Sequence, residues 1–478
     1  MAGLVCAALT ALAAAPAIFL YLDTGRGAFD EINFHEPAIR TFAQAWPRVD
    51  LSDYLSATTP GYHLLMAGLL RLLGESEWIL RAANLLITCA LVGAVGAACA
   101  MRTHGRRAGG LHPAAAGVLV TLPMVGSMYV LASGIWLLPD NLGWLFVLAV
   151  TVLSLRLCRE GGGGRQTIGL LVLAGTALAA LVFVRQIHLW AAAPIWVAAW
   201  LSGGNGLILG DLPRRAGRAL AAAVATLPAF LLIAWFVRLW GGLTPPTFHA
   251  HFRISPAAPV LVLALIGIYS VFFLPVLLPS LVALQRERRW ALAAAAALGL
   301  LTAAIPETTH SMAEGRWTGI WTIARVFEER GLMIADRSLF MGALAGLGAV
   351  CLAGWVRWVG VREGLVVLAA LAAFTAAQTA SAQLWQRYSE PFILMLLALL
   401  AARSGPEPST DPSPAPRPPR SFALAGPALL ALLLLAQGYL TFARAEPVDY
   451  FGFTPGGERI RRYFEGDIPE PVQRPPRP

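Results

Sequence analysis

The stretch 4–22, LVCAALTALAAAPAIFLYL, contains no charged residue and is long enough to cross a lipid bilayer as one helix. It is followed shortly afterwards by the polar stretch 29–37, FDEINFHEP. The same alternation of apolar runs and short polar segments continues to residue 442. No basic residue precedes the first run, as one would in a secretory signal peptide. The pattern therefore predicts a retained first helix and a protein of many membrane-spanning helices.

The composition supports a membrane protein. Hydrophobic residues make up 57% of the chain and charged residues 13%, and the mean hydropathy is +0.64. Soluble domains carry about 25% charged residues, so lipid is expected to cover most of the outer surface. The net charge is +9, but the arginines form small clusters between apolar runs, which is typical of topology signals and argues against a nucleic-acid partner. The cysteines form no CxxC pair and no His/Cys cluster, so neither a disulfide framework nor a zinc site is predicted.

The apolar segments predict about thirteen spans and an all-α fold, a polytopic transmembrane helical bundle. The predicted spans lie near 4–22, 77–100, 113–132, 139–157, 167–184, 189–202, 219–239, 257–281, 291–306, 338–356, 364–382, 391–402 and 421–442. We divide the chain into a unit of residues 1–402, a cytoplasmic Pro-rich linker 403–420, and a last span with an outer tail, 421–478. Within the first long loop, 61–74 is apolar but too short to span, so it predicts a helix lying on the membrane surface.

The arginines predict the orientation of the bundle. With the N-terminus in the cytoplasm, every second loop is rich in arginine, as around Arg102, Arg159, Arg214, Arg288 and Arg362 and in the linker. The positive-inside rule assigns these loops to the cytoplasm. The other loops mix acids, histidines and tryptophans, and we expect them on the non-cytoplasmic face. They comprise 23–76, a short segment near 134, 185–188, 241–256, 307–337, 383–390 and the tail after 443.

The first outer loop carries the strongest chemical signal. Asp30 and Glu31 are adjacent carboxylates, and His35 follows them closely. A carboxylate at the membrane face can take a proton from an incoming hydroxyl, which is general-base chemistry. The alternative is an acidic loop that only solvates a helix start. Further along, the turn signal Thr-Pro-Gly at 59–61 places Tyr62 and His63 at the head of the surface helix, either as a cap or as part of a pocket floor.

Two arginines stand at the outer ends of predicted spans. Arg185 is flanked by apolar runs, with Gln186 and His188 beside it, and Arg387 is followed by Tyr388. Arginine suits bidentate binding of phosphate, and an ionisable residue at such a position marks a functional site by default. The alternatives are an arginine that snorkels to the interface for the first, and an ion pair with Glu390 or with another helix for the second.

Three further groups of polar residues stand in or beside the predicted outer loops. The stretch 307–317, ETTHSMAEGRW, has a composition typical of sugar binding and adds Glu314 and Arg316 as candidate substrate-binding residues. His249 and His251 have no acid nearby, so no metal site is predicted. Asp140 follows a proline at the start of a span, where the role of helix N-cap is enough to explain it.

These motifs resemble those of the dolichyl-phosphate-glucose α-1,2-glucosyltransferase family, which adds the terminal glucose to the lipid-linked oligosaccharide. The resemblance lies in the first loop (DEI, FHEP and TTPGY), in Arg185-Gln186, in Gly241-Gly242, and in Arg387-Tyr388 with Pro391. It implies a GT-C glycosyltransferase fold, a polyprenyl-phosphate-sugar donor and no cofactor. It also implies that Asp30 is the catalytic base. Two departures make the match to this subgroup looser: Asn33 is an extra residue in the first motif, and 187–188 read Ile-His instead of Thr-Asn.

The leading hypothesis is therefore an inverting hexosyltransferase of the membrane, with glucose as the sugar that the resemblance implies. The acceptor would be a lipid-linked or cell-envelope glycan, and the arginine-rich, lysine-free sequence suggests the inner membrane of a bacterium, with the site facing the periplasm. Asp30 would act as base, Glu31 and His35 would position the acceptor hydroxyl, and the two arginines would bind the lipid phosphate. The alternatives are a flippase or secondary transporter, which would place its ionisable groups near the bilayer midplane, and an inactive scaffold.

Overall fold

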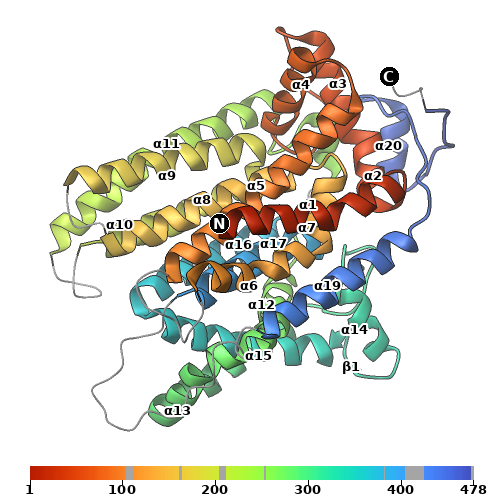
Figure 1. The fold of residues 1–478 in the computed structure, drawn as a ribbon. Coiled ribbons are helices and arrows are strands. Elements are labelled where there is room, and N and C mark those ends of the chain that lie inside the picture. Colours follow the sequence, from red (N-terminus) through yellow and green to blue (C-terminus); the bar gives the residue numbers. More distant parts are fainter. Residues whose placement is uncertain are drawn as a thin grey trace.

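The computed structural model describes residues 1–103, 112–160, 164–203, 211–251, 254–381, 383–403 and 425–474. This part of the chain is mainly helical (Figure 1). Its one sheet is a small antiparallel pair made by β1 (Met333–Ile334) and β2 (Arg337–Ser338). The predicted all-α class is therefore confirmed, and most of the predicted linker 403–420 lies outside the described residues.

Nine helices of the described part are long and apolar enough to cross a membrane, or ten if one bent pair counts as a span. The chain is thus a multi-pass membrane protein. The nine are α1 (Ala2–Leu20), α5 (Glu77–Thr103), α8 (Asp140–Glu160), α9 (Gly164–Val184), α11 (Leu212–Trp240), the run Ala258–Ala304, α15 (Leu339–Val359), α16 (Val361–Thr379) and α19 (Ala425–Ala443). The long run comprises α12 (Ala258–Ser270), the short η4 (Val271–Phe273) and α13 (Leu274–Ala304).

The difference from about thirteen predicted spans has local causes. Ser127 has extended backbone (φ −64°, ψ 120°) and its hydroxyl accepts the Val130 N–H, so the predicted span 113–132 is broken into α6 (Pro113–Gly126) and α7 (Met128–Ile135), bent by 69°. Two other predicted spans lie within the single run Ala258–Ala304, but this run consists of two helices that meet at a kink, because Arg288 at the predicted cytoplasmic loop has non-helical backbone (φ −148°, ψ 53°).

The two remaining differences are short helices. α10 (Ala192–Leu201) and α17 (Glu390–Ala401) have 10 and 12 residues, fewer than a bilayer needs. In α17 all residues from Glu390 to Leu400 are buried. A helix that is apolar all round and buried on every side belongs to the interior of a bundle. Hydropathy therefore identified a core helix here, which other helices shield from lipid.

Small residues allow the spanning helices to pack closely. A Cβ added to Gly3 in α1 would lie 2.7 Å from the carbonyl oxygen of Gly93 in α5, and one added to Gly348 in α15 would lie 1.9 Å from that of Leu263 in α12. Both distances are below any contact that a real side chain makes, so only glycine fits. Close backbone approach through small residues is the usual way in which membrane helices associate.

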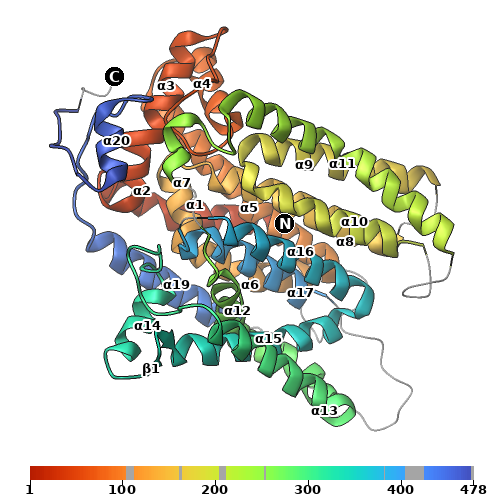
Figure 2. The ribbon, with the colours of Figure 1, turned by 180° about the vertical axis from the view of Figure 1, so that it is seen from behind.

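Shorter elements gather at one end of the bundle. Those that the figures label lie toward the right of Figure 1 and toward the left of Figure 2. They are α2 (Gly25–Asp30), the π-helical turn η1 (Glu31–His35), α3 (Glu36–Ala45), α4 (Gly61–Leu73), η2 (Gln186–Ala191), η3 (Pro246–His251), α14 (Ile320–Glu328), η5 (Gln386–Tyr388) and α20 (Glu458–Glu465). The predicted surface helix is α4, which packs against α3.

Candidate functional site

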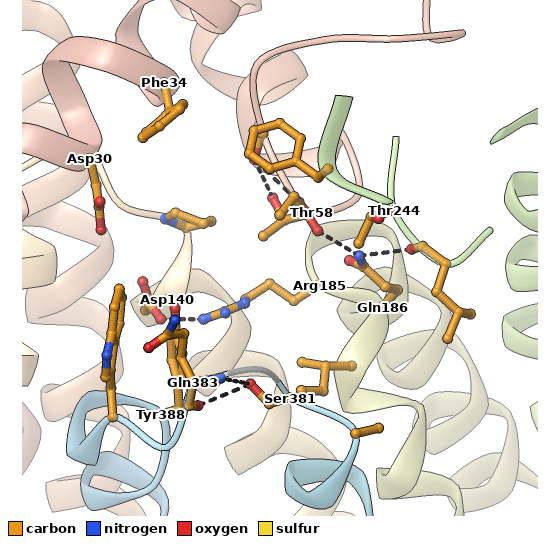
Figure 3. Close-up of a pocket in the computed structure, with 18 of the residues that line it drawn as sticks. Asp30, Phe34, Thr58, Asp140, Arg185, Gln186, Thr244, Ser381, Gln383 and Tyr388 are labelled. Carbon is orange, nitrogen blue, oxygen red and sulfur yellow. Dashed lines mark hydrogen bonds and ion pairs between the residues drawn. The ribbon is translucent and has the colours of Figure 1, made fainter. Parts of the chain in front are cut away.

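A cavity of about 750 Å³ opens at this end of the bundle. Its walls combine charged, aromatic and small residues, as expected for a site that orients a sizeable ligand. All but one of the segments that the sequence predicts to be outside contribute at least one side chain, and Asp140 comes from the outer start of the predicted span 139–157. The residues are Asp30 and His35, Asp140, Arg185 and His188, Thr244, Trp317, Arg387 and Tyr388, and Tyr463. Segments more than 400 residues apart in sequence therefore share one pocket, and Figure 3 shows several of these side chains facing the cavity.

Asp30 is the last residue of α2 and is 6% exposed. Its Oδ2 lies 2.7 Å from Nη1 of Arg387, and its Oδ1 lies 3.2 Å from Nε of Arg26, one helical turn earlier. Burial raises the pKa of Asp30, but the charges of Arg387 and Arg26 outweigh burial, so the pKa is lowered below its ordinary value. Asp30 is therefore an ionised carboxylate inside the pocket at neutral pH.

Aromatic rings separate the three arginines of the pocket. The guanidinium carbon of Arg387 lies 4.7 Å from the ring centre of Trp385 and 5.0 Å from that of Tyr388. Arg26 shares the Trp385 ring at 5.3 Å, and Arg185 shares the Tyr388 ring at 5.3 Å. Cation–π contacts hold each guanidinium in place while leaving its edge available for hydrogen bonds. The ion pair proposed for Arg387 with Glu390 is not formed, because Arg387 pairs with Asp30 and Glu390 accepts hydrogen bonds from Ser127 and Tyr269 at 2.5 Å each.

Asp140 is a site residue that the sequence analysis missed. It is the first residue of α8, it lines the cavity, and it forms an ion pair with Arg185. The N-cap role assigned to it therefore leaves out its main contact. The sequence does contain a signal for this ion pair. Arg185 stands at the outer end of the next helix, and opposite charges at the ends of adjacent helices are expected to pair.

Gln186 and His188, which follow Arg185 in the sequence, make different contacts. Gln186 accepts the Thr59 N–H at 2.9 Å and donates to the carbonyl oxygens of Ala57 and Leu243 at 2.7 and 3.0 Å. It thus joins the first outer loop to the loop after α11. His188 is 1% exposed, accepts the indole N–H of Trp190 at 3.2 Å, and burial lowers its pKa to about 3. His188 is therefore neutral in the pocket wall.

His35 is bonded to His63 in the pocket wall. His35 lines the cavity, and its Nδ1 lies 3.0 Å from Nε2 of His63, which is fully buried in the first turn of α4. Next to His63, the Tyr62 hydroxyl donates to Asn84 in α5 at 2.9 Å. Among the described residues, the cavity lining does not include Tyr62 or His63, so they act behind the pocket surface.

Glu31, Glu314 and Arg316 likewise lie outside the cavity lining of the described residues. Glu31 is 0% exposed, pairs with Arg81 of α5 at 2.7 Å, and accepts the Leu137 N–H at 2.9 Å. Arg316 is 4% exposed and donates to the Thr309 carbonyl oxygen at 2.8 Å within its own loop. From that loop Trp317 reaches the cavity.

The outer tail closes one side of the pocket. Asn33, the extra residue of the first motif, lies in the π-helical turn η1, where an additional residue widens a helix. Its amide donates to the Asp449 carbonyl oxygen at 2.9 Å and accepts the Phe451 N–H at 2.8 Å. Further along, Tyr463 in α20 lines the cavity and its hydroxyl accepts a hydrogen bond from Arg26 at 3.4 Å. The tail is thus part of the site.

In the described part of the chain, no group of three or more His, Cys, Asp or Glu side chains is placed to hold a metal ion. The ring of His249 contacts the Thr244 carbonyl oxygen at 2.9 Å. A comparison with known protein families finds no family model that matches the chain, and no curated protein is significantly similar to it.

Proposed function

We propose that this protein is a membrane glycosyltransferase that moves a hexose from a polyprenyl-phosphate-sugar donor to a hydroxyl of a lipid-linked or cell-envelope glycan. The observation that carries the proposal is the ionised Asp30 in a cavity beside Arg387, with the pair Arg185–Asp140 on the adjoining wall. A carboxylate base next to cations that accept a phosphate is the combination that such a transfer needs. The GT-C type of fold and glucose as the sugar belong to the proposal, as the motif resemblance implies.

The charge of the pocket suits the donor. The described lining residues include three arginines and two aspartates, which leaves one net positive charge. A sugar linked to a polyprenol through one phosphate is a phosphodiester with a single negative charge. Binding of this group would therefore neutralise the pocket, and arginine provides planar donors that match phosphate oxygens.

The proposed reaction is a single displacement at the anomeric carbon. Asp30 takes the proton of the acceptor hydroxyl, the acceptor oxygen forms a bond to that carbon, and the bond from the carbon to the phosphate oxygen breaks. The phosphate leaves as a monoester with one more negative charge, which Arg387 and Arg185 stabilise. Arg387 now holds Asp30 at 2.7 Å. Contact between Arg387 and the donor phosphate would loosen this pair and free the carboxylate to act as base.

The test is transfer by purified protein in lipid nanodiscs, from a panel of radiolabelled polyprenyl-phosphate hexoses to a membrane lipid extract. Asp30→Asn is compared with wild type, and Asp50→Asn serves as a matched control because Asp50 is in the same loop and exposed. We expect transfer by the wild type and the control, and none by a folded Asp30→Asn protein. Equal transfer by Asp30→Asn would remove Asp30 as base. If no donor supports transfer, while the protein moves a lipid-linked sugar between the leaflets of a vesicle, the flippase alternative would replace the proposal.

The proposed location is the inner membrane of a bacterium, with the cavity facing the periplasm. The arginine-rich segments support this orientation, because Arg102, Arg159 and Arg403 all lie within 4 Å of Glu363. They therefore share one end of the bundle, while the cavity is built from the segments predicted to be outside. A cysteine label introduced at Asp50 and reacted with a membrane-impermeant reagent on intact cells would test the orientation.

A further inference from the structure

We propose that His63 is a positioning residue that fixes the tautomer of His35, so that His35 presents a neutral Nε2–H donor to the cavity. The assignment of the tautomer rests on the contact between the two rings and on the buried surroundings of His63. What His35 then binds rests on the proposed function. In that setting the ligand is an oxygen acceptor of the substrates, either a sugar hydroxyl or a phosphate oxygen.

The two imidazoles lie end to end. Nδ1 of His35 and Nε2 of His63 are 3.0 Å apart, the ring planes differ by 29°, and the ring centres are 5.2 Å apart. The centre separation exceeds the nitrogen separation by about two ring radii, so the contact is an in-plane hydrogen bond and not a face-to-face stack. One nitrogen must therefore carry the proton and the other must accept it.

Both rings are neutral near pH 7. Burial lowers the pKa of His35 to about 4, although the charges of Asp30 and Asp140 favour its imidazolium form. Arg387 and Arg185 face the same ring and disfavour the cation. Burial holds the pKa of His63 well below its ordinary value, and the charge that His35 would carry when protonated lowers it further. The pair thus shares a single hydrogen-bonding proton.

The surroundings of His63 decide where that proton lies. Nδ1 of His63 is buried and has no hydrogen-bond partner among the described residues. The ring is enclosed by the side chains of Phe42, Tyr54 and Tyr62, with ring centres 6.4, 6.1 and 5.5 Å away. A stranded N–H donor is rarer in proteins than an unpaired acceptor. Nδ1 of His63 is therefore unprotonated, and its Nε2–H donates to His35.

The consequence is a fixed role for His35. With Nδ1 accepting from His63, the proton of His35 is on Nε2. His35 then offers a donor to a ligand oxygen beside Asp30, and it has no lone pair available to act as base. The chain of hydrogen bonds also ends at His63, because Nδ1 of His63 has no hydrogen-bond partner among the described residues. The pair therefore sets geometry and does not conduct protons to water.

The tautomer can be read directly by NMR of protein labelled with ¹⁵N in its 8 histidines, with no substrate present. The His35 signals are assigned by their loss in His35→Gln. We expect a protonated Nε2 and a hydrogen-bonded, unprotonated Nδ1 in the wild type. In His63→Leu nothing fixes the tautomer, so the Nδ1 and Nε2 signals of His35 should move toward the averaged values of a mixture of the two tautomers. In His63→Gln, which keeps a polar partner, Nδ1 should stay hydrogen-bonded. A protonated Nδ1 in wild-type His35 would overturn the assignment, whatever reaction the protein catalyses.

A double-mutant cycle tests the positioning role during transfer. His63→Leu should lower kcat/KM roughly fivefold, which is the size of one neutral hydrogen bond. His35→Ala should lower it further, and the double variant should be no worse than His35→Ala alone, because His63 acts through His35. Effects that add fully would contradict the proposal. A rise in KM for the donor would assign the ligand oxygen to the phosphate, and a rise in KM for the acceptor would assign it to a hydroxyl.

Discussion

Asp30 and Arg387 meet across 357 residues of sequence, with Nη1 of the arginine 2.7 Å from Oδ2 of the aspartate. The two side chains come from opposite ends of the chain, α2 and η5, and both line the cavity. A buried carboxylate keeps its charge only when cations compensate for lost water. The pair therefore explains how Asp30 stays ionised in a pocket that also contains apolar rings.

Arg26, the second arginine that pairs with Asp30, allows a prediction of how the transfer rate depends on pH. Asp30 has a pKa below its ordinary value of 3.8, so the transfer rate should stay flat as the pH falls from 7 to about 5. Arg26→Met removes one of the cations that lower this pKa. With less positive charge to oppose the effect of burial, the pKa of Asp30 rises. The acid limb of the pH–rate profile should then move up by about one pH unit.

Initial rates measured from pH 3 to 8, with recovery checked at pH 7, would show the shift. Asp50→Asn is the control and should follow the wild-type profile. An unchanged acid limb in Arg26→Met would mean that Asp30 does not titrate in the rate-limiting step.

The pair Arg185–Asp140 predicts a non-additive effect on stability. The side chains are 12% and 7% exposed, so removing one leaves the other charge buried and unpaired. Arg185→Gln and Asp140→Asn should each cost about 3 kcal/mol, and the double variant should cost clearly less than the sum. Asp467→Asn is a matched control, because its pair with Arg462 is exposed and should contribute under about 1 kcal/mol.

Thermal unfolding in detergent would measure these effects. Inorganic phosphate should raise the melting temperature of Asp140→Asn more than that of the wild type, since the pocket then carries one more positive charge. Equal stabilisation by phosphate in both proteins would count against an anion site at Arg185.

Hydropathy predicted the helices well, because lipid leaves the backbone no alternative to internal hydrogen bonding. Every apolar run that lies in the described part is helical. The number of spans was less predictable. Whether α17 contacts lipid or protein depends on which helices surround it, and the break at Ser127 depends on one side-chain cap. Both are tertiary or single-residue effects, which a window of about twenty residues averages out.

The candidate site was predictable in part, because Asp30, Arg185 and Arg387, which the sequence places in predicted outer segments, all line the cavity. Which charged side chains form ion pairs with one another was not predictable from the sequence. Glu31 adjoins Asp30 in sequence, yet the π-helical turn directs it to Arg81, away from the cavity. Asp140 was assigned a local role because its partner is 45 residues away. One sequence shows which residues carry charge, but only the fold shows which charges meet.

The extra residue Asn33 leads to a prediction about the tail. Its side chain makes two hydrogen bonds to the tail backbone, at Asp449 and Phe451. Asn33→Ala removes both, so residues 445–474 should exchange amide hydrogen faster and be cut sooner by trypsin at Arg461. Asn33→Asp keeps the acceptor for Phe451 but loses the donor, and it should behave in between. Hydrogen exchange measured by mass spectrometry would separate the three proteins. Identical exchange in all of them would show that the aromatic contacts of the tail suffice.

At the opposite end of the bundle, Glu363 is 4% exposed and contacts three arginines. Arg102 lies at 2.9 Å, Arg403 at 3.4 Å and Arg159 at 3.8 Å. Glu363→Gln leaves these charges without a counter-ion, so the free energy of unfolding should fall by about 3 kcal/mol while KM for the donor stays the same. Glu287→Gln removes an exposed carboxylate that pairs with Arg357, and it should cost under about 1 kcal/mol. Melting temperatures and transfer kinetics of both variants test this prediction. A changed KM in Glu363→Gln would mean that the two ends of the bundle are coupled. An unchanged melting temperature would mean that the three arginines find other partners.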